Sequence, residues 1–167
     1  MALITFIVGS FAIGLYLKQK RSYKRDVASL ILQEIRYAEQ HVRNYKQFGV
    51  YPLACKLVPT NSWYINIHLF ARDFKETDVD LISNFYAQVS YVDNLIDNIS
   101  NAKIKTLIPI PSSSVVPSVG QPQENTQFEL GAQKILKEVS EKIEFIYNTP
   151  TIDKLRIVSQ KRWYQLI

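Results

Sequence analysis

His68 and Asp73 are the two residues whose types and spacing come closest to a catalytic pair. An aspartate that follows a histidine by five residues can orient the imidazole, which then acts as a general base on a hydroxyl. The segment between them reads as a helix, however, and side chains five apart on a helix point to different faces. We therefore expect that the two side chains do not act together, and we predict a protein without catalytic activity.

A metal or cofactor site would need other polar residues to converge, and their spacing does not bring them together. A di-iron bundle uses a Glu-x-x-His pair on each of two helices, whereas Glu34 and His41 are seven apart and no glutamate lies three before His68. The single cysteine, Cys55, excludes an internal disulfide and a multi-cysteine metal site. We predict no cofactor and no bound metal.

Asp93 and Asp97 are four residues apart on one predicted helical face. Together with Asp78 and Asp80 they are expected to form a solvated acidic stripe, with a metal site as the alternative. The same carboxylates could also dock a basic partner.

The element that must position everything else is the first one, an uninterrupted apolar run over residues 1–17 (MALITFIVGSFAIGLYL). At 1.5 Å per residue it forms a helix of roughly 25 Å, at the short end of what crosses a hydrocarbon core of about 30 Å. A cleaved signal peptide needs basic residues before the run and a small-residue cleavage site after it, and neither is present. We predict a transmembrane anchor over residues 1–17, with a buried core helix of a soluble protein as the alternative.

A basic juxtamembrane segment, residues 18–25, follows the apolar run. Its charged side chains are predicted to lie at the membrane interface: Lys18, Lys20, Arg21, Lys24 and Arg25. The chain carries 20 Lys and Arg against 15 Asp and Glu, so these five basic residues account for the whole formal net charge of +5. The even balance elsewhere argues against a nucleic-acid partner.

The basic segment also predicts the orientation, because Lys and Arg that flank a span stay on the cytoplasmic side. We expect a single-pass protein of the cell (inner or plasma) membrane, with its N-terminus outside and its C-terminal domain in the cytoplasm. Recognition of anionic lipid headgroups is the alternative role of the same charges.

Two further contacts with the membrane are expected. Ser10 and Gly14 are four residues apart, and small residues at this spacing allow two helices to approach each other closely in a bilayer. Trp163 belongs to a last predicted helix, over residues 151–166, which is surrounded by basic residues. Counting chain reversals places the start of that helix near the bilayer, where it either lies on the anionic leaflet or caps the core.

Residues 26–167 are predicted to form one all-α domain, an antiparallel bundle of four to five helices. No Gly or Pro interrupts residues 25–47, so the anchor should continue as one helix to about Gln47. Apolar seams with steps of three and four predict three more helices, over residues 62–74, from Thr77 onward and over residues 126–147. The seam expected to be central is Ile82, Phe85, Val89, Val92, Ile96 and Ile99, and the next is Phe128, Ala132, Ile135, Val139, Ile143 and Ile146.

One segment, residues 109–127, lacks helical character because it is rich in Pro and Ser (PIPSSSVVPSVGQPQENTQ). We predict a flexible loop there, and docking of a partner on it is the alternative.

The layout of the first hundred residues resembles that of uncharacterised small prokaryotic membrane-anchored helical proteins. It consists of an N-terminal span, a first long helix, a helix opened by Thr60, Ser62 and Trp63, and another that bears Phe85 and Tyr86. This resemblance covers about residues 1–100 and implies no particular activity.

These observations favour a membrane-tethered helical scaffold or interaction module at the cytoplasmic face. Its expected partners are membrane lipid and either another protein or a second copy of the chain. The alternative is a membrane-active or lipid-binding effector, of stress or phage-defence type, that oligomerises through its transmembrane helix. An enzyme with His68 as its base is the third hypothesis.

Overall fold

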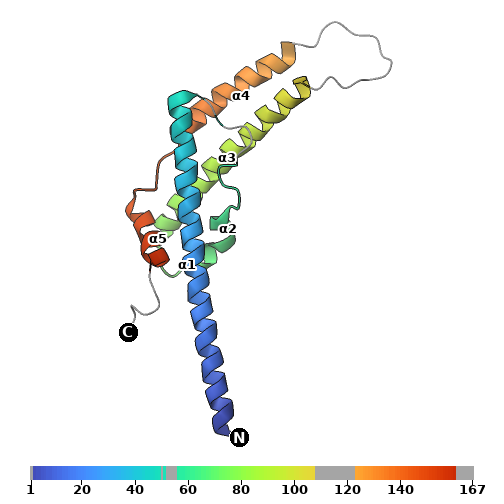
Figure 1. Ribbon diagram of the computed structural model, residues 1–167. Coiled ribbons are helices and arrows are strands. Elements are labelled where there is room, and N and C mark those ends of the chain that lie inside the picture. Colours follow the sequence, from blue (N-terminus) through green and yellow to red (C-terminus); the bar gives the residue numbers. More distant parts are fainter. Residues whose placement is uncertain (1, 50, 52–55, 108–122, 161–167) are drawn as a thin grey trace, which may run out of the picture. The chain divides into compact units, whose positions relative to one another are not determined.

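In a computed structural model of the chain, the residues described are 2–49, 51, 56–107 and 123–160. They form five α-helices and one short 3₁₀-helix, and no strand occurs among them (Figure 1). The predictions of an all-α protein and of a helical bundle are therefore confirmed. The chain divides into two compact units.

Helix α1, Ala2–Phe48, is one continuous helix of 47 residues, about 70 Å long. The prediction that the apolar run continues unbroken to about Gln47 is confirmed. Gly49 ends the helix with a φ of 71°, and its N–H donates to the carbonyl of Tyr45 at 2.7 Å. A left-handed residue just after a helix is typically glycine, because other side chains are strained in that conformation.

None of the helices in the described ranges is long and apolar enough to cross a membrane. The transmembrane span predicted over residues 1–17 is therefore not supported. The apolar run ends at Leu17, and Lys18, Lys20 and Arg21 follow within the next turn.

The helix predicted over residues 62–74 is much shorter in the structure. Helix α2, Ser62–Asn66, passes directly into the 3₁₀-helix η1, Ile67–Leu69, and turns follow. The side chain of Asn66 donates to the carbonyl of Ser62 at 2.9 Å. Asparagine competes in this way with the backbone hydrogen bonds of a helix, which explains the early end.

Helix α3, Glu76–Leu107, begins where its acidic first turn indicated. The carboxylate of Asp78 accepts from the N–H of Lys75 at 3.0 Å and so caps a free donor at the helix start. All six members of the predicted central seam are buried: Ile82, Phe85, Val89, Val92, Ile96 and Ile99. This seam is the most accurate of the sequence predictions.

Helices α4, Gln123–Lys142, and α5, Pro150–Gln160, complete the described part of the chain. Helix α4 starts and ends earlier than predicted, so residues 123–127 belong to its beginning, while residues 109–122 of the predicted loop lie outside the described residues. Its seam also differs, since Ile135 is exposed and Leu136 is buried instead.

The first unit comprises Met1–Arg36, Thr60–Ser83 and Ile146–Ile167. Its core combines aliphatic side chains of α1, of α3, of α5 and of the turn before α5 with aromatic side chains of α2 and the residues after it: Ala28, Ile31, Ile35, Trp63, Phe70, Phe74, Ile82, Ile146, Ile152 and Leu155. The rings of Trp63 and Phe70 lie 6.0 Å apart, and the indole N–H of Trp63 donates to Ser83 at 2.9 Å. The buried tryptophan is thus satisfied on both its apolar and its polar side.

The second unit comprises Tyr37–Pro59 and Asn84–Phe145. Its core is formed by the end of α1, the chain that follows it, α3 and α4: Ala38, Val42, Tyr51, Leu57, Val58, Phe85, Tyr86, Val89, Val92, Ile96, Ile99, Ala132, Leu136 and Ile143.

Candidate functional site

The N-terminal half of α1 has the most unusual surface of the first unit, because every residue from 9 to 21 is exposed. Five large apolar side chains contribute to this surface: Phe11, Ile13, Leu15, Tyr16 and Leu17. Their exposed fractions run from 47 % at Leu17 to 69 % at Phe11. Contiguous apolar exposure of this kind marks a surface that binds protein, membrane or ligand.

These side chains do not form a stripe along one face of α1. Successive residues of an α-helix are rotated by about 100°, so positions 11, 13, 15, 16 and 17 are distributed around the helix. A helix that is apolar all round is normally surrounded by an apolar environment. A groove on a partner protein would cover one side of this helix only.

The basic residues that follow divide into two groups. Lys18, Lys20 and Arg21 are exposed. Lys24 instead forms an ion pair with Asp73, and its ammonium lies 5.6 Å from the centre of the Phe70 ring.

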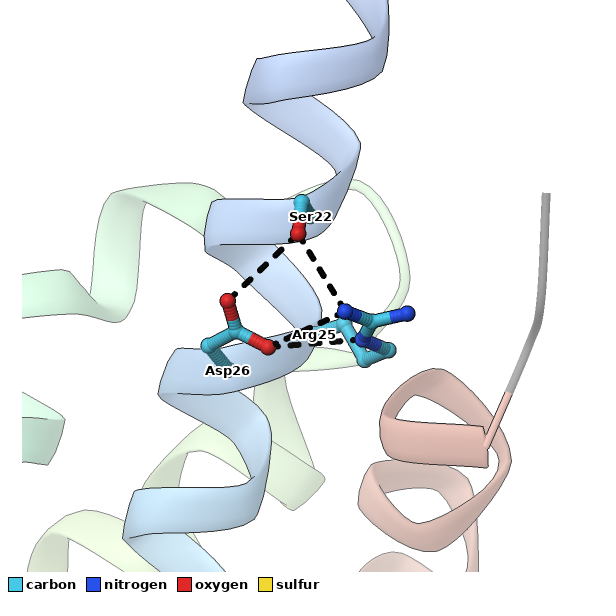
Figure 2. A network of polar contacts seen from close by, with 3 residues as sticks. All are labelled: Ser22, Arg25 and Asp26. Carbon is cyan, nitrogen blue, oxygen red and sulfur yellow. Dashed lines mark hydrogen bonds and ion pairs between the residues drawn. The ribbon is translucent and has the colours of Figure 1, made fainter.

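Arg25 belongs to a local network with Ser22 and Asp26, which Figure 2 shows. Its guanidinium donates to Asp26 at 3.3 Å and to the hydroxyl of Ser22 at 3.2 Å. Lys24 and Arg25 are thus only half-exposed and paired with aspartates, and the exposed basic border consists of Lys18, Lys20 and Arg21.

The other residues predicted to contact the membrane are less informative. Ser10 and Gly14 are both exposed, and a Cβ added at Gly14 would meet no atom within 4 Å. Self-association through this pair remains a prediction. Trp163 lies outside the described residues.

The candidate catalytic residues are not assembled into a site. His68 is exposed in η1, whereas Asp73 is paired with Lys24 of α1. Over the described ranges, no group of three or more His, Cys, Asp or Glu side chains could hold a metal ion.

The predicted solvated acidic stripe is wrong for two of its four members, since Asp78 and Asp93 are buried, whereas Asp80 and Asp97 are exposed. Asp78 accepts hydrogen bonds from Thr151 at 2.8 Å and from Lys154 at 2.5 Å. The hydrogen bond from Lys154 is the main cause that lowers the pKa of Asp78 to about 2. Asp78 thus joins the start of α3 to α5 within the first unit.

Asp93 fixes the chain between α1 and α2 in the second unit. Its carboxylate accepts from the N–H of Leu57 at 2.7 Å and from that of Val58 at 3.3 Å. Burial raises the pKa of Asp93, and these two hydrogen bonds act in the opposite direction. The carboxylate therefore replaces the secondary-structure partners that these backbone groups lack.

Glu34 has a similar role in the first unit, which the sequence analysis does not predict. It accepts from the N–H groups of Thr60 at 3.2 Å and Ser62 at 3.0 Å, and from the hydroxyl of Thr60. A signal for both carboxylates was available, because Glu34 follows Ile31 by three residues and Asp93 follows Val89 by four. A carboxylate at the spacing of an apolar seam indicates a buried acceptor.

Comparisons with protein-family models, with curated proteins and with solved structures found no match for this chain. The resemblance of residues 1–100 to small prokaryotic membrane-anchored proteins therefore stays a prediction.

Proposed function

We propose that this protein is a non-catalytic helical interaction module that attaches to a membrane through the N-terminal half of α1. The observation that carries the proposal is the exposure of large apolar side chains on several sides of the helix between residues 11 and 17. Lipid chains cover such a helix on every side, which a single protein groove does not. The module then acts at the cytoplasmic face of the cell membrane.

The basic border is consistent with this attachment. Lys18, Lys20 and Arg21 follow the apolar segment directly, where the lipid headgroups would lie. Each large apolar side chain contributes about 1.5–3 kcal/mol when it is fully transferred from water. Because Phe11 and its neighbours are already partly covered, the sum for the five is several kcal/mol, enough for stable attachment together with the electrostatic attraction.

The helical domain beyond this segment supplies the interaction surface in the proposal. Its partner is another protein or a second copy of the chain. Light scattering of the detergent-solubilised full chain distinguishes these two, since a second copy doubles the mass of the particle.

Flotation with phospholipid vesicles tests the attachment. We expect the full chain to float with vesicles and the variant Phe11→Asp/Leu15→Asp to float at least tenfold less. The matched control is Ile65→Asp, which places a charge at an equally exposed apolar residue of α2 and should float like the unmodified chain. Equal flotation of all three proteins would exclude the N-terminal half of α1 as the attachment site.

A further inference from the structure

A groove of about 640 Å³ lies in the second unit, between the end of α1 and helix α4. The side chains that matter for its chemistry are Tyr45 and Lys46 from α1, and Leu130, Lys134, Lys137 and Glu141 from α4. The volume is in the range of about 300–1,000 Å³ that small-molecule sites occupy.

The charge of the groove is positive. Three lysines, Lys46, Lys134 and Lys137, are among the residues that line it, and Glu141 is the one acidic residue among them. Lys134 and Lys137 are exposed and lie three residues apart, so they occupy one side of α4. The formal charge of these side chains is therefore +2.

Lys46 is held in place by the protein. Its ammonium donates to the carbonyls of Glu141 at 3.3 Å and Ile143 at 3.5 Å, near the end of α4. It also lies 4.7 Å from the centre of the Phe145 ring. An ammonium fixed in this way contributes its charge to the groove without a further loss of side-chain freedom on binding.

The apolar part of the groove is also fixed in position. The ring of Tyr45 stacks on that of Tyr51 with centres 4.2 Å apart and an angle of 15° between the planes. The Tyr51 hydroxyl lies 3.2 Å from the hydroxyl of Ser140, which itself donates to the carbonyl of Leu136 at 2.5 Å. The hydroxyls of Tyr51 and of Ser140, which lines the groove, thus satisfy each other, and Tyr45 and Leu130 supply apolar surface.

Gly49 adds no side chain to the groove. It lines the groove, and a Cβ built on it would meet no atom within 4 Å. The turn that ends α1 therefore adds no side chain to fill the space.

We propose that this groove binds an organic phosphate, a molecule that joins a phosphate group to an apolar or aromatic body. The phosphate lies between the ammonium groups, and the body lies against Tyr45 and Leu130. Lysine ammonium groups bind phosphate as point charges, and a phosphate monoester near its dianionic state matches the charge of the groove. The ligand is either a free organic phosphate or the headgroup of a phospholipid.

Calorimetric titration with 1-naphthyl phosphate tests the site, with inorganic phosphate and 1-naphthol as the two halves of that probe. We expect saturable binding of 1-naphthyl phosphate, at least tenfold tighter than of either half. The variant Lys134→Gln/Lys137→Gln should bind it at least tenfold more weakly. The control Lys142→Gln removes an exposed lysine of α4 that pairs with Glu138 outside the groove, and its affinity should change less than twofold.

Competition by vesicles that contain phosphatidic acid separates the two sources of the ligand. The measurement uses the Phe11→Asp/Leu15→Asp background, so that α1 does not bring the vesicles to the protein. Displacement of 1-naphthyl phosphate indicates a lipid headgroup, and its retention indicates a free organic phosphate, either of which supports the site. Absence of saturable binding, or equal affinity of the double variant and the control, would overturn it. The outcome of these binding measurements is independent of the flotation experiment, because the groove variants leave residues 9–21 unchanged.

Discussion

Asp78 illustrates how one buried carboxylate joins distant parts of the chain. It accepts from Thr151 and Lys154, which lie 73 and 76 residues further along the sequence, and from the adjacent N–H of Lys75. These donors stabilise the charged form and lower the pKa of Asp78 to about 2. In an unfolded chain the pKa of an aspartate is about 3.9.

Replacement of Asp78 by asparagine should therefore destabilise the protein in a pH-dependent way. A lowered pKa in the folded state gives stability that is present above about pH 4 and is lost as the pH falls toward 2. With allowance for the partial exposure of Lys154, we expect a loss of about 1–2 kcal/mol at pH 7 that shrinks between pH 4 and pH 2. Urea denaturation of both proteins across this range measures it.

Asp80 provides the control for this prediction, because it is exposed on the same turn of α3. Asp80→Asn should change the free energy of unfolding by less than about 0.5 kcal/mol at either pH. A loss in Asp78→Asn that is the same at pH 7 and at pH 2 would mean that the carboxylate charge is not what stabilises this contact.

The sequence predicted that these aspartates lie on a helix, but it did not predict which of them are buried. Asp78 and Asp80 are equivalent by type and by position near the start of a helix, and the structure buries only Asp78. The difference arises from Thr151 and Lys154, whose approach depends on the tertiary fold. For Asp93 the backbone donors come from an irregular segment, for which the sequence has no periodic signal.

At the scale of the elements, α1 and the seam of α3 were predicted well, α4 only in part and the short helix α2 poorly. The seam of α3 is regular over six residues, and all six are buried. Helix α2 has five residues, and the side chain of Asn66 is enough to end it. Periodicity therefore determines an element when many residues agree, whereas a single side chain decides a short one.

Helix α4 allows a direct test of which seam is correct, because Ile135 and Leu136 are neighbours. The sequence placed Ile135 in the core, but Ile135 is 45 % exposed and Leu136 is 5 % exposed. We expect Leu136→Ala to lower the free energy of unfolding by about 2–4 kcal/mol, since it leaves a cavity in the second unit. Ile135→Ala should cost less than about 1 kcal/mol.

Thermal or urea denaturation of these two single variants measures the difference. Both substitutions remove the same number of carbon atoms from α4. A difference between their free energies of unfolding therefore reports on burial and not on the lost side-chain volume. If Ile135→Ala proved the more destabilising, the seam read from the sequence would be right and the register of α4 described above would be wrong.

At the scale of the whole molecule, charge and exposed apolar surface are concentrated in the same place. The formal net charge of +5 equals the charge of the five basic residues in segment 18–25. The structure adds that Lys18, Lys20 and Arg21 are exposed directly after the apolar residues, and that Lys24 and Arg25 are half-exposed and paired with aspartates. Composition alone gives the charge, but only the fold shows which of these residues face outward.

This arrangement predicts that attachment to a membrane depends on lipid charge and on salt. A Lys or Arg near an anionic surface contributes about 1 kcal/mol, and the attraction weakens as ionic strength shortens the screening length. The full chain should therefore bind vesicles that contain phosphatidylglycerol more tightly than vesicles of phosphatidylcholine alone. Lys20→Gln/Arg21→Gln should reduce this preference by about tenfold or more at low salt, with a smaller effect at 0.5 M salt. Binding to neutral vesicles, which relies on Phe11 and its apolar neighbours, should change little.

The variant Lys56→Gln/Arg72→Gln removes the same charge from exposed positions elsewhere and tests whether the location of the charge matters. An equal loss in both double variants would show that net charge, and not the border of the apolar segment, directs the protein to anionic membranes.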